Sequence, residues 1–276
     1  MLEAVFLGIL QGLTEFLPIS SSAHIRIAGA LFGTDEDPGA TFTAITQIGT
    51  ELAVLIYFRR DIARIARAWL RKLLHKNLAV EQLQDAKMGS LIILGSLPIV
   101  VLGYLGQDLI RKDFRSLWLI AFTLIIFGLV LGVADRYGKI ERDLTQLTRF
   151  HGVLYGLSQS LALIPGVSRS GATIAMGRFL GYTRESALRY SFLLALPAVF
   201  GSGLYELKGA ISESSRTEVF SISETLLATS FAFIIGYAVI AWLIKFVTTR
   251  SFAPFIAYRI ALGSILLLLL ATGVIS

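Results

Sequence analysis

Two short stretches of this chain hold the side-chain types that bind phosphate and transfer protons, and both interrupt apolar sequence. The first is GLTEFLPISSSAH, Gly12 to His24, and the second is GLSQSLALIPGVSRSGAT, Gly156 to Thr173. They lie within longer apolar segments at about residues 3–33 and 150–181. Burying an unpaired charge is costly, so polar residues in such segments need a partner, a water-filled cavity or a chemical role.

The first stretch offers the groups that hydrolysis requires. Gln11 and Glu15 are four residues apart and therefore share one face of a helix. A carboxylate such as Glu15 can position water, act as a base or share a divalent cation. Ser21 and His24 are of the types that attack phosphorus or shuttle a proton. A lone histidine in a membrane is more often a structural hydrogen-bonding group, but the serine run and Glu15 beside it favour a functional role for His24.

The proline in each stretch predicts a broken helix that begins again just beyond it. Pro18 and Pro165 cannot continue a helix. Serines, which are typical N-cap residues, follow both prolines: Ser20, Ser21, Ser22, Ser168 and Ser170. The start of a helix carries free N–H groups and a positive dipole end, which attract anions. Arg169 adds a planar guanidinium that matches phosphate geometry. We therefore predict a pyrophosphate cradle; the alternative is that the serines only cap helices and Arg169 only pairs with Glu15.

Composition places these stretches in a membrane. Of 276 residues, 55% are hydrophobic and only 16% are charged, and the mean hydropathy is +0.71. Soluble domains are usually close to one quarter charged. There is no cysteine, which excludes disulfides and thiolate metal sites. The net charge of +6 is expected to serve orientation and anionic lipid headgroups rather than nucleic acid.

The predicted fold is an all-α integral membrane protein with six transmembrane helices and two re-entrant helical hairpins in an inverted repeat. The six helices are expected at about 42–58, 88–107, 117–135, 186–205, 223–246 and 253–274. Gly12 to Glu15 matches Gly156 to Gln159, and Ile19 to Ala23 matches Val167 to Gly171. We predict a single membrane domain over 1–276, with repeat one at about 1–135 and repeat two at about 150–276. The alternative is two proline-kinked helices whose similarity is due to chance.

Loop charge predicts the orientation. The loop Arg59 to Lys87 is strongly basic, and the loop after Asp135 adds further basic residues, so both are expected in the cytoplasm. The first hairpin then enters from outside and the second from the cytoplasmic side. Within 60–87, basic residues alternate with Ile65, Trp69 and Leu73, which indicates an interfacial helix. Gln47 and Glu51 either line the same cavity as the hairpins or form hydrogen bonds between helices.

QGLTEFLPISSSAH and PGVSRSGAT (Pro165 to Thr173) resemble the two signature motifs of the undecaprenyl-diphosphatase family, the bacitracin-resistance proteins. The similarity extends over nearly the whole chain, including SFLLALP at 191–197 and FAPFIAYR at 252–259. The resemblance implies an integral membrane enzyme that removes the terminal phosphate of undecaprenyl pyrophosphate, which recycles the lipid carrier for cell-wall synthesis. It further implies a location in the inner (plasma) membrane, contact with membrane lipids, and an active site that faces the outer side. Two copies could form a homodimer.

The resemblance also suggests roles for individual residues. The expected catalytic residues are Glu15, Ser21, His24 and Arg169. The expected phosphate-binding residues are Gln11, Ser20, Ser22, Ser168, Ser170 and Thr173. A divalent cation, Mg or Ca, is expected to assist, with Glu15 as its candidate protein ligand. This chain has glutamine at position 11 where some members have glutamate, which argues against a metal site with two carboxylates. The alternative function is transport, because secondary transporters also use broken helices in inverted repeats.

Overall fold

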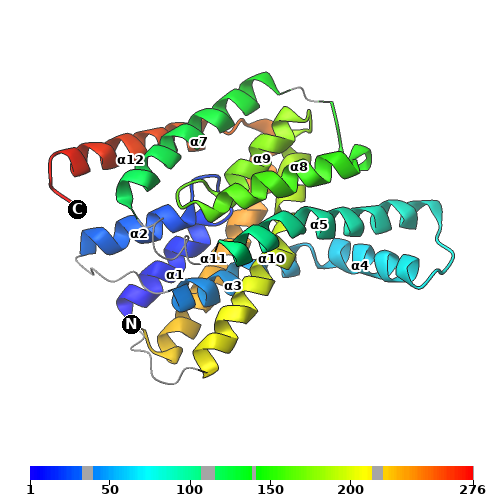
Figure 1. Ribbon diagram of the computed structural model, residues 1–276, viewed down its shortest axis with the longest axis horizontal. Helices are drawn as coiled ribbons and strands as arrows, with labels where there is room; N and C mark the ends of the chain where they lie inside the picture. Colours follow the sequence, from blue (N-terminus) through cyan, green and yellow to red (C-terminus); the bar gives the residue numbers. More distant parts are fainter. Residues whose placement is uncertain (33–39, 107–115, 139–140, 213–219, 276) are drawn as a thin grey trace.

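The computed structural model describes residues 1–32, 40–106, 116–138, 141–212 and 220–275, and in these ranges the chain is helical. Figure 1 shows the helices packed into one bundle. In chain order they are α1 Leu2–Thr14, α2 Ser21–Phe32, α3 Ala40–Tyr57, α4 Arg59–Leu73, α5 Val80–Leu105, α7 Leu117–Tyr137, α8 Arg149–Ser160, α9 Arg169–Phe179, α10 Arg184–Ser212, α11 Ile222–Thr249 and α12 Ala253–Ala271. Short 3-10 turns lie at Leu144–Gln146 and Leu161–Leu163.

Five of these helices are long and apolar enough to cross a membrane: α5, α7, α10, α11 and α12. They lie where the sequence predicts spanning helices, with ends that differ by a few residues in most cases. The sixth predicted helix, at about 42–58, is present as α3, whose apolar part is shorter than a full span. The structure therefore supports a multi-pass helical membrane protein.

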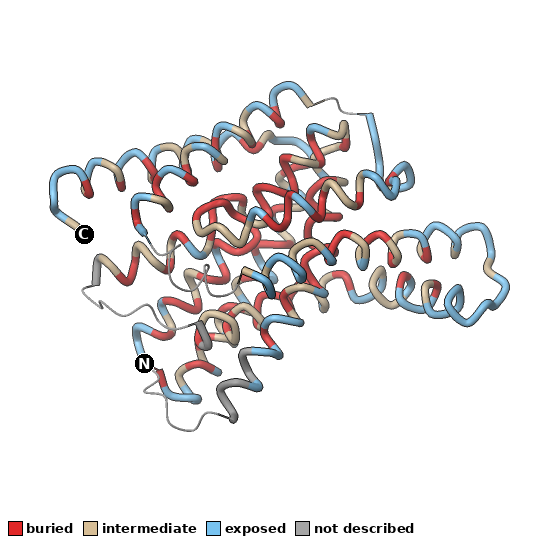
Figure 2. Tube along the Cα trace, viewed as in Figure 1, coloured by how far each residue is buried: buried red, intermediate tan, exposed pale blue. Residues whose placement is uncertain are grey.

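Helix α5 begins earlier than predicted. It starts at Val80 rather than 88, so part of the expected loop 60–87 is helical, and α4 occupies the earlier part of that loop. The polar first turns of α5 pack beside α4, where Arg64 contacts Asp85 and Trp69 lies against Gly89. The predicted start is too late because hydropathy detects only the apolar part of a helix. Figure 2 shows that the joined ends of α4 and α5 are largely exposed.

Glycines set how closely the helices approach one another. α1 packs along α11, and α8 packs along α5. A Cβ atom at Gly8 would lie 2.3 Å from the Ala228 carbonyl oxygen, and one at Gly156 would lie 2.4 Å from the Gly95 carbonyl oxygen. Close backbone contact through small residues is a common basis of helix association in membranes.

Replacing Gly8 by alanine is expected to destabilise the protein by about 1–3 kcal/mol, because the added methyl group must push α1 away from α11. The measurement is the thermal unfolding midpoint in detergent. Gly132→Ala is the matched control, since a Cβ there meets Ile256 at an ordinary 3.5 Å. A Gly8→Ala midpoint equal to that of Gly132→Ala would contradict the close contact.

Both predicted helix breaks are present. The first separates α1 from α2 and contains Pro18; the second separates α8 from α9 and contains Pro165. The residue just before each new helix has a positive φ, 74° at Ser20 and 68° at Ser168. Such backbone is uncommon outside glycine and must be held by its surroundings. Neither segment is a continuous helix.

Candidate active site

The two helix breaks meet at a cavity of about 600 Å³. Its polar lining comes from the breaks and from α1 and α3, and its apolar lining comes mainly from α5 and α10. The lining residues predicted from sequence are Gln11, Glu15, Ser20, Ser21, Ser22, Ser168 and Arg169. Gln47 lines it as well. A polar end and an apolar wall suit an amphipathic ligand with an anionic head.

Glu15 is the centre of the polar lining. Its Oε2 accepts hydrogen bonds from Ser21 Oγ at 2.7 Å and from Gln11 Nε2 at 2.9 Å. Its Oε1 accepts from Arg169 Nη2 at 2.9 Å and from Gln47 Nε2 at 3.2 Å. Glu15 stands at the C-terminal end of α1, so the break between α1 and α2 turns Ser21 back toward it. The carboxylate is thus placed to take a proton from Ser21.

Arg169 joins the second break to the first. Its Nη2 contacts Glu15 and also Glu51, each at 2.9 Å, while Glu51 is fully buried in α3. Within the described part of the chain, Nε and Nη1 of Arg169 are buried and have no hydrogen-bond partner. An unpaired buried donor on a charged group is costly. Arg169 lines the cavity, and these two nitrogens, although covered in this structure, are the donors of its guanidinium that no described protein group uses.

The starts of α2 and α9 both open on the cavity. Ser20 Oγ accepts from the Ala23 amide at 3.4 Å, and Ser168 Oγ accepts from the Gly171 amide at 3.2 Å. In each break the capping serine also lies 3.2 Å from the serine two residues later, Ser22 or Ser170. The first N–H groups of each helix have no partner within that helix. Two helix starts directed at one cavity create a favourable place for negative charge.

His24 is not brought to the cavity beside Glu15. Its Nδ1 lies 2.7 Å from the Ser20 carbonyl oxygen and its Nε2 lies 2.7 Å from the Tyr258 hydroxyl of α12. Its ring also stacks on the ring of Tyr258. Since a carbonyl can only accept, Nδ1 carries a proton, and in the neutral ring Nε2 then accepts from the Tyr258 hydroxyl. The sequence predicted His24 beside Glu15 because the two residues flank one run of serines. In the structure, the position of His24 on α2 directs its imidazole toward α12 instead.

Two further predicted residues are close to the site but do not line the cavity. Ser170 Oγ donates to the Leu17 carbonyl at 3.1 Å, which ties the second break to the first. Thr173 Oγ1 contacts the Arg169 carbonyl at 2.8 Å and the Ser191 hydroxyl at 2.5 Å. These contacts hold α9 in place rather than presenting the hydroxyls to a ligand.

The structure adds residues that the motif analysis did not assign to the site. Gln47 and Glu51, which the sequence left between two interpretations, both contact the Glu15–Arg169 pair. Arg259 in α12 is completely buried and reaches both helix breaks. It is the one charged residue between Ala253 and the end of the chain, which is the signal that could have identified it.

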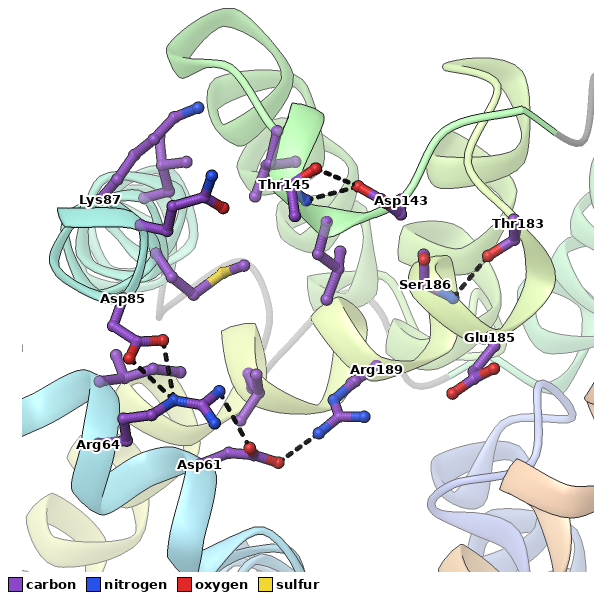
Figure 3. A pocket seen from close by; sticks show the side chains of 17 residues that line it. Asp61, Arg64, Asp85, Lys87, Asp143, Thr145, Thr183, Glu185, Ser186 and Arg189 are labelled. Carbon is purple, nitrogen blue, oxygen red and sulfur yellow. Dashed lines mark hydrogen bonds and ion pairs between the residues drawn. The ribbon is translucent and has the colours of Figure 1, made fainter. Parts of the chain in front are cut away.

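A second cavity, of about 510 Å³, lies at the other ends of α5 and α10 (Figure 3). Arg64 and Arg189 line it, but both contact Asp61, and Arg64 also contacts Asp85 at 2.8 Å. The wall further includes the carboxylates of Asp143 and Glu185. Because its arginines are already paired and it holds four carboxylates, this cavity is a poor match for a pyrophosphate.

The fold and the site together define a multi-pass helical membrane protein with a buried polar centre between two broken helices. The chain belongs to the family described as bacitracin resistance protein BacA, whose family model matches residues 4–265. It is 60% identical over 274 residues to an undecaprenyl-diphosphatase of Pseudarthrobacter chlorophenolicus, covering 99% of this chain and 98% of the relative. It is 57% identical to an undecaprenyl-diphosphatase of Micrococcus luteus, covering 100% and 99%. It is 58% identical to undecaprenyl-diphosphatase 2 of Agrobacterium fabrum, covering 100% and 97%.

Proposed function

We propose that this protein hydrolyses undecaprenyl pyrophosphate to undecaprenyl phosphate and inorganic phosphate. The observation that carries the proposal is the contact of Ser21 and Arg169 with the two oxygens of Glu15, at the polar end of an apolar-walled cavity. The identity of the substrate rests on the family membership and on the names of relatives that match nearly the whole chain. The prenyl chain would lie against α5 and α10, with the pyrophosphate at the helix breaks.

The reaction needs a nucleophile, a base and stabilisation of charge at phosphorus. We propose that Ser21, or a water in its place, attacks the terminal phosphorus while Glu15 accepts the proton. The bridging oxygen leaves with undecaprenyl phosphate. A phosphoserine formed at Ser21 would be hydrolysed by water with Glu15 as the base. The two free nitrogens of Arg169 and the starts of α2 and α9 would stabilise the negative charge on the phosphoryl oxygens.

We propose no direct part in the chemistry for His24 and no resident protein site for the divalent cation. Both ring nitrogens of His24 have partners, so we propose that it holds the Ser20 carbonyl in place. Glu15 is a poor fit as a resident metal ligand, because both of its oxygens accept hydrogen bonds and the described residues form no group of three or more metal-binding side chains. We therefore propose that Mg or Ca arrives with the pyrophosphate.

We further propose the inverted repeat, with six spanning helices and two re-entrant hairpins in one membrane domain. Its support is the paired geometry of the two breaks: Ser20 corresponds to Ser168 in its positive φ, its capping role and its contact with the serine two residues later. The basic residues of α4 support a cytoplasmic location for that helix in the inner (plasma) membrane. The main cavity lies at the opposite ends of α5 and α10, which supports a site on the outer side.

The test is release of inorganic phosphate from undecaprenyl pyrophosphate by the purified protein in detergent. A detergent micelle does not separate two compartments, so transport cannot account for the release. We expect catalytic turnover. The Arg169→Lys variant, purified identically, is the control that excludes a contaminating phosphatase. If the native protein released no phosphate while remaining folded, the transport function would replace the enzymatic one.

A further inference from the structure

Arg259 is a completely buried guanidinium on α12 that contacts both helix breaks. Its Nη1 donates to the Pro18 carbonyl at 3.1 Å in the first break. Its Nη2 donates to the carbonyls of Gly166 at 2.9 Å and Val167 at 3.0 Å in the second. Its Nε donates to the Leu124 carbonyl of α7 at 3.3 Å. One side chain therefore connects two segments that are almost 150 residues apart in sequence.

The partners of Arg259 are unusual for a buried charge. In the described part of the chain it forms no ion pair, whereas Arg169 contacts two carboxylates. A buried cation without a carboxylate partner is costly unless several acceptors compensate it. Here three backbone carbonyls that lie outside the helices, those of Pro18, Gly166 and Val167, accept hydrogen bonds from the guanidinium. Removing the guanidinium would leave those carbonyls buried without a donor, in the two breaks where Ser20 and Ser168 have a positive φ.

The contacted carbonyls lie next to the residues that define the site. Val167 directly precedes Ser168 and Arg169, and Pro18 lies two residues before Ser20. Gly166 itself has a φ of 89°, and a Cβ there would lie 2.0 Å from Thr123 Oγ1. Positive φ at a non-glycine residue costs on the order of 1–3 kcal/mol and persists only when neighbours hold it. Arg259 contacts the chain one residue before Ser168 and two residues before Ser20.

We propose that Arg259 is a positioning residue that fixes the two helix breaks relative to each other, so that the starts of α2 and α9 are directed at the same anion. This inference deepens the proposed hydrolysis and rests on it for its kinetic consequence. Tyr258, its neighbour on α12, supports the same arrangement because it holds His24, which in turn holds the Ser20 carbonyl. A role limited to attaching α12 to α7 is the competing explanation, since Leu124 also accepts from Arg259.

The first test compares Arg259→Lys and Arg259→Met with the same substitutions at Arg178. Arg178 is also buried, donates to two carbonyls, those of Tyr182 and Gly138, and pairs with Asp135, but it lies at the end of α9 that is far from the break. We expect both Arg259 variants to lose at least about 100-fold in kcat with a smaller change in KM, per folded molecule. The Arg178 variants are expected to unfold at lower temperature but to keep kcat within about twofold. Equal kcat losses at the two positions would overturn the proposal.

The second test measures the geometry without any reaction. The chain has no cysteine, so spin labels can be placed at Ala30→Cys on α2 and Phe179→Cys on α9, each near the helix end far from its break. We expect one narrow distance distribution in the otherwise native chain and in the Arg178→Met background. In the Arg259→Met background the distribution should broaden. An unchanged distribution there would overturn the positioning role, even if the hydrolase function held.

Discussion

Replacing Arg169 by lysine is expected to lower the rate of phosphate release by about 10³-fold or more. Lysine keeps the charge but loses the planar fork, so it cannot contact Glu15 and Glu51 through one nitrogen and still present two others to a phosphate. Loss of a single charge-stabilising donor typically costs about 10²–10³ in kcat. The measurement is single-turnover phosphate release at saturating substrate, with binding of inorganic phosphate as a second readout.

The matched control for this substitution is Arg189→Lys. Arg189 is also an arginine that contacts a carboxylate, Asp61, but it lines the second cavity and is 38% exposed. We expect this variant to keep the native rate within about twofold. If Arg169→Lys also kept it, the guanidinium would not be part of the site.

Replacing Glu15 by glutamine is the second substitution with a large expected effect. Glutamine keeps the size of the side chain but cannot accept the proton of Ser21, so we expect kcat to fall by about 10²–10⁴-fold. The loss should appear in kcat more than in KM, because the neutral side chain also removes one negative charge that would repel the pyrophosphate. The measurement is steady-state phosphate release across substrate concentrations.

The Glu51→Gln variant tests whether Glu15 acts as a base or only as an ion-pair partner of Arg169. Both carboxylates contact the same Nη2 at 2.9 Å, but Glu51 does not line the cavity. We therefore expect a smaller loss, about tenfold, from Glu51→Gln. Equal losses from the two variants would mean that Glu15 acts only by holding Arg169, and the assignment of Glu15 as the base would fail.

The sequence by itself determined the membrane class, the long apolar helices and the two helix breaks, and it offered the pairing of Arg169 with Glu15 as the alternative to a phosphate cradle. These features are local or chemically obligatory: proline ends a helix, serine caps the next one, and a guanidinium in an apolar segment requires a partner. In the structure this pairing is present together with the geometry that favours the cradle. The two free nitrogens of Arg169 make both compatible.

Only the tertiary structure decided which polar residues share the cavity. His24 and Ser21 are three residues apart on α2, yet Ser21 contacts Glu15 and His24 contacts Tyr258, because a separate helix packs against each side of α2. Two further helices contribute to the site: α3 through Gln47 and Glu51, and α12 through Arg259. Their distance from the breaks along the sequence does not indicate that they contact them. Spacing along the chain fixes the face of a helix, but long-range packing fixes what that face meets.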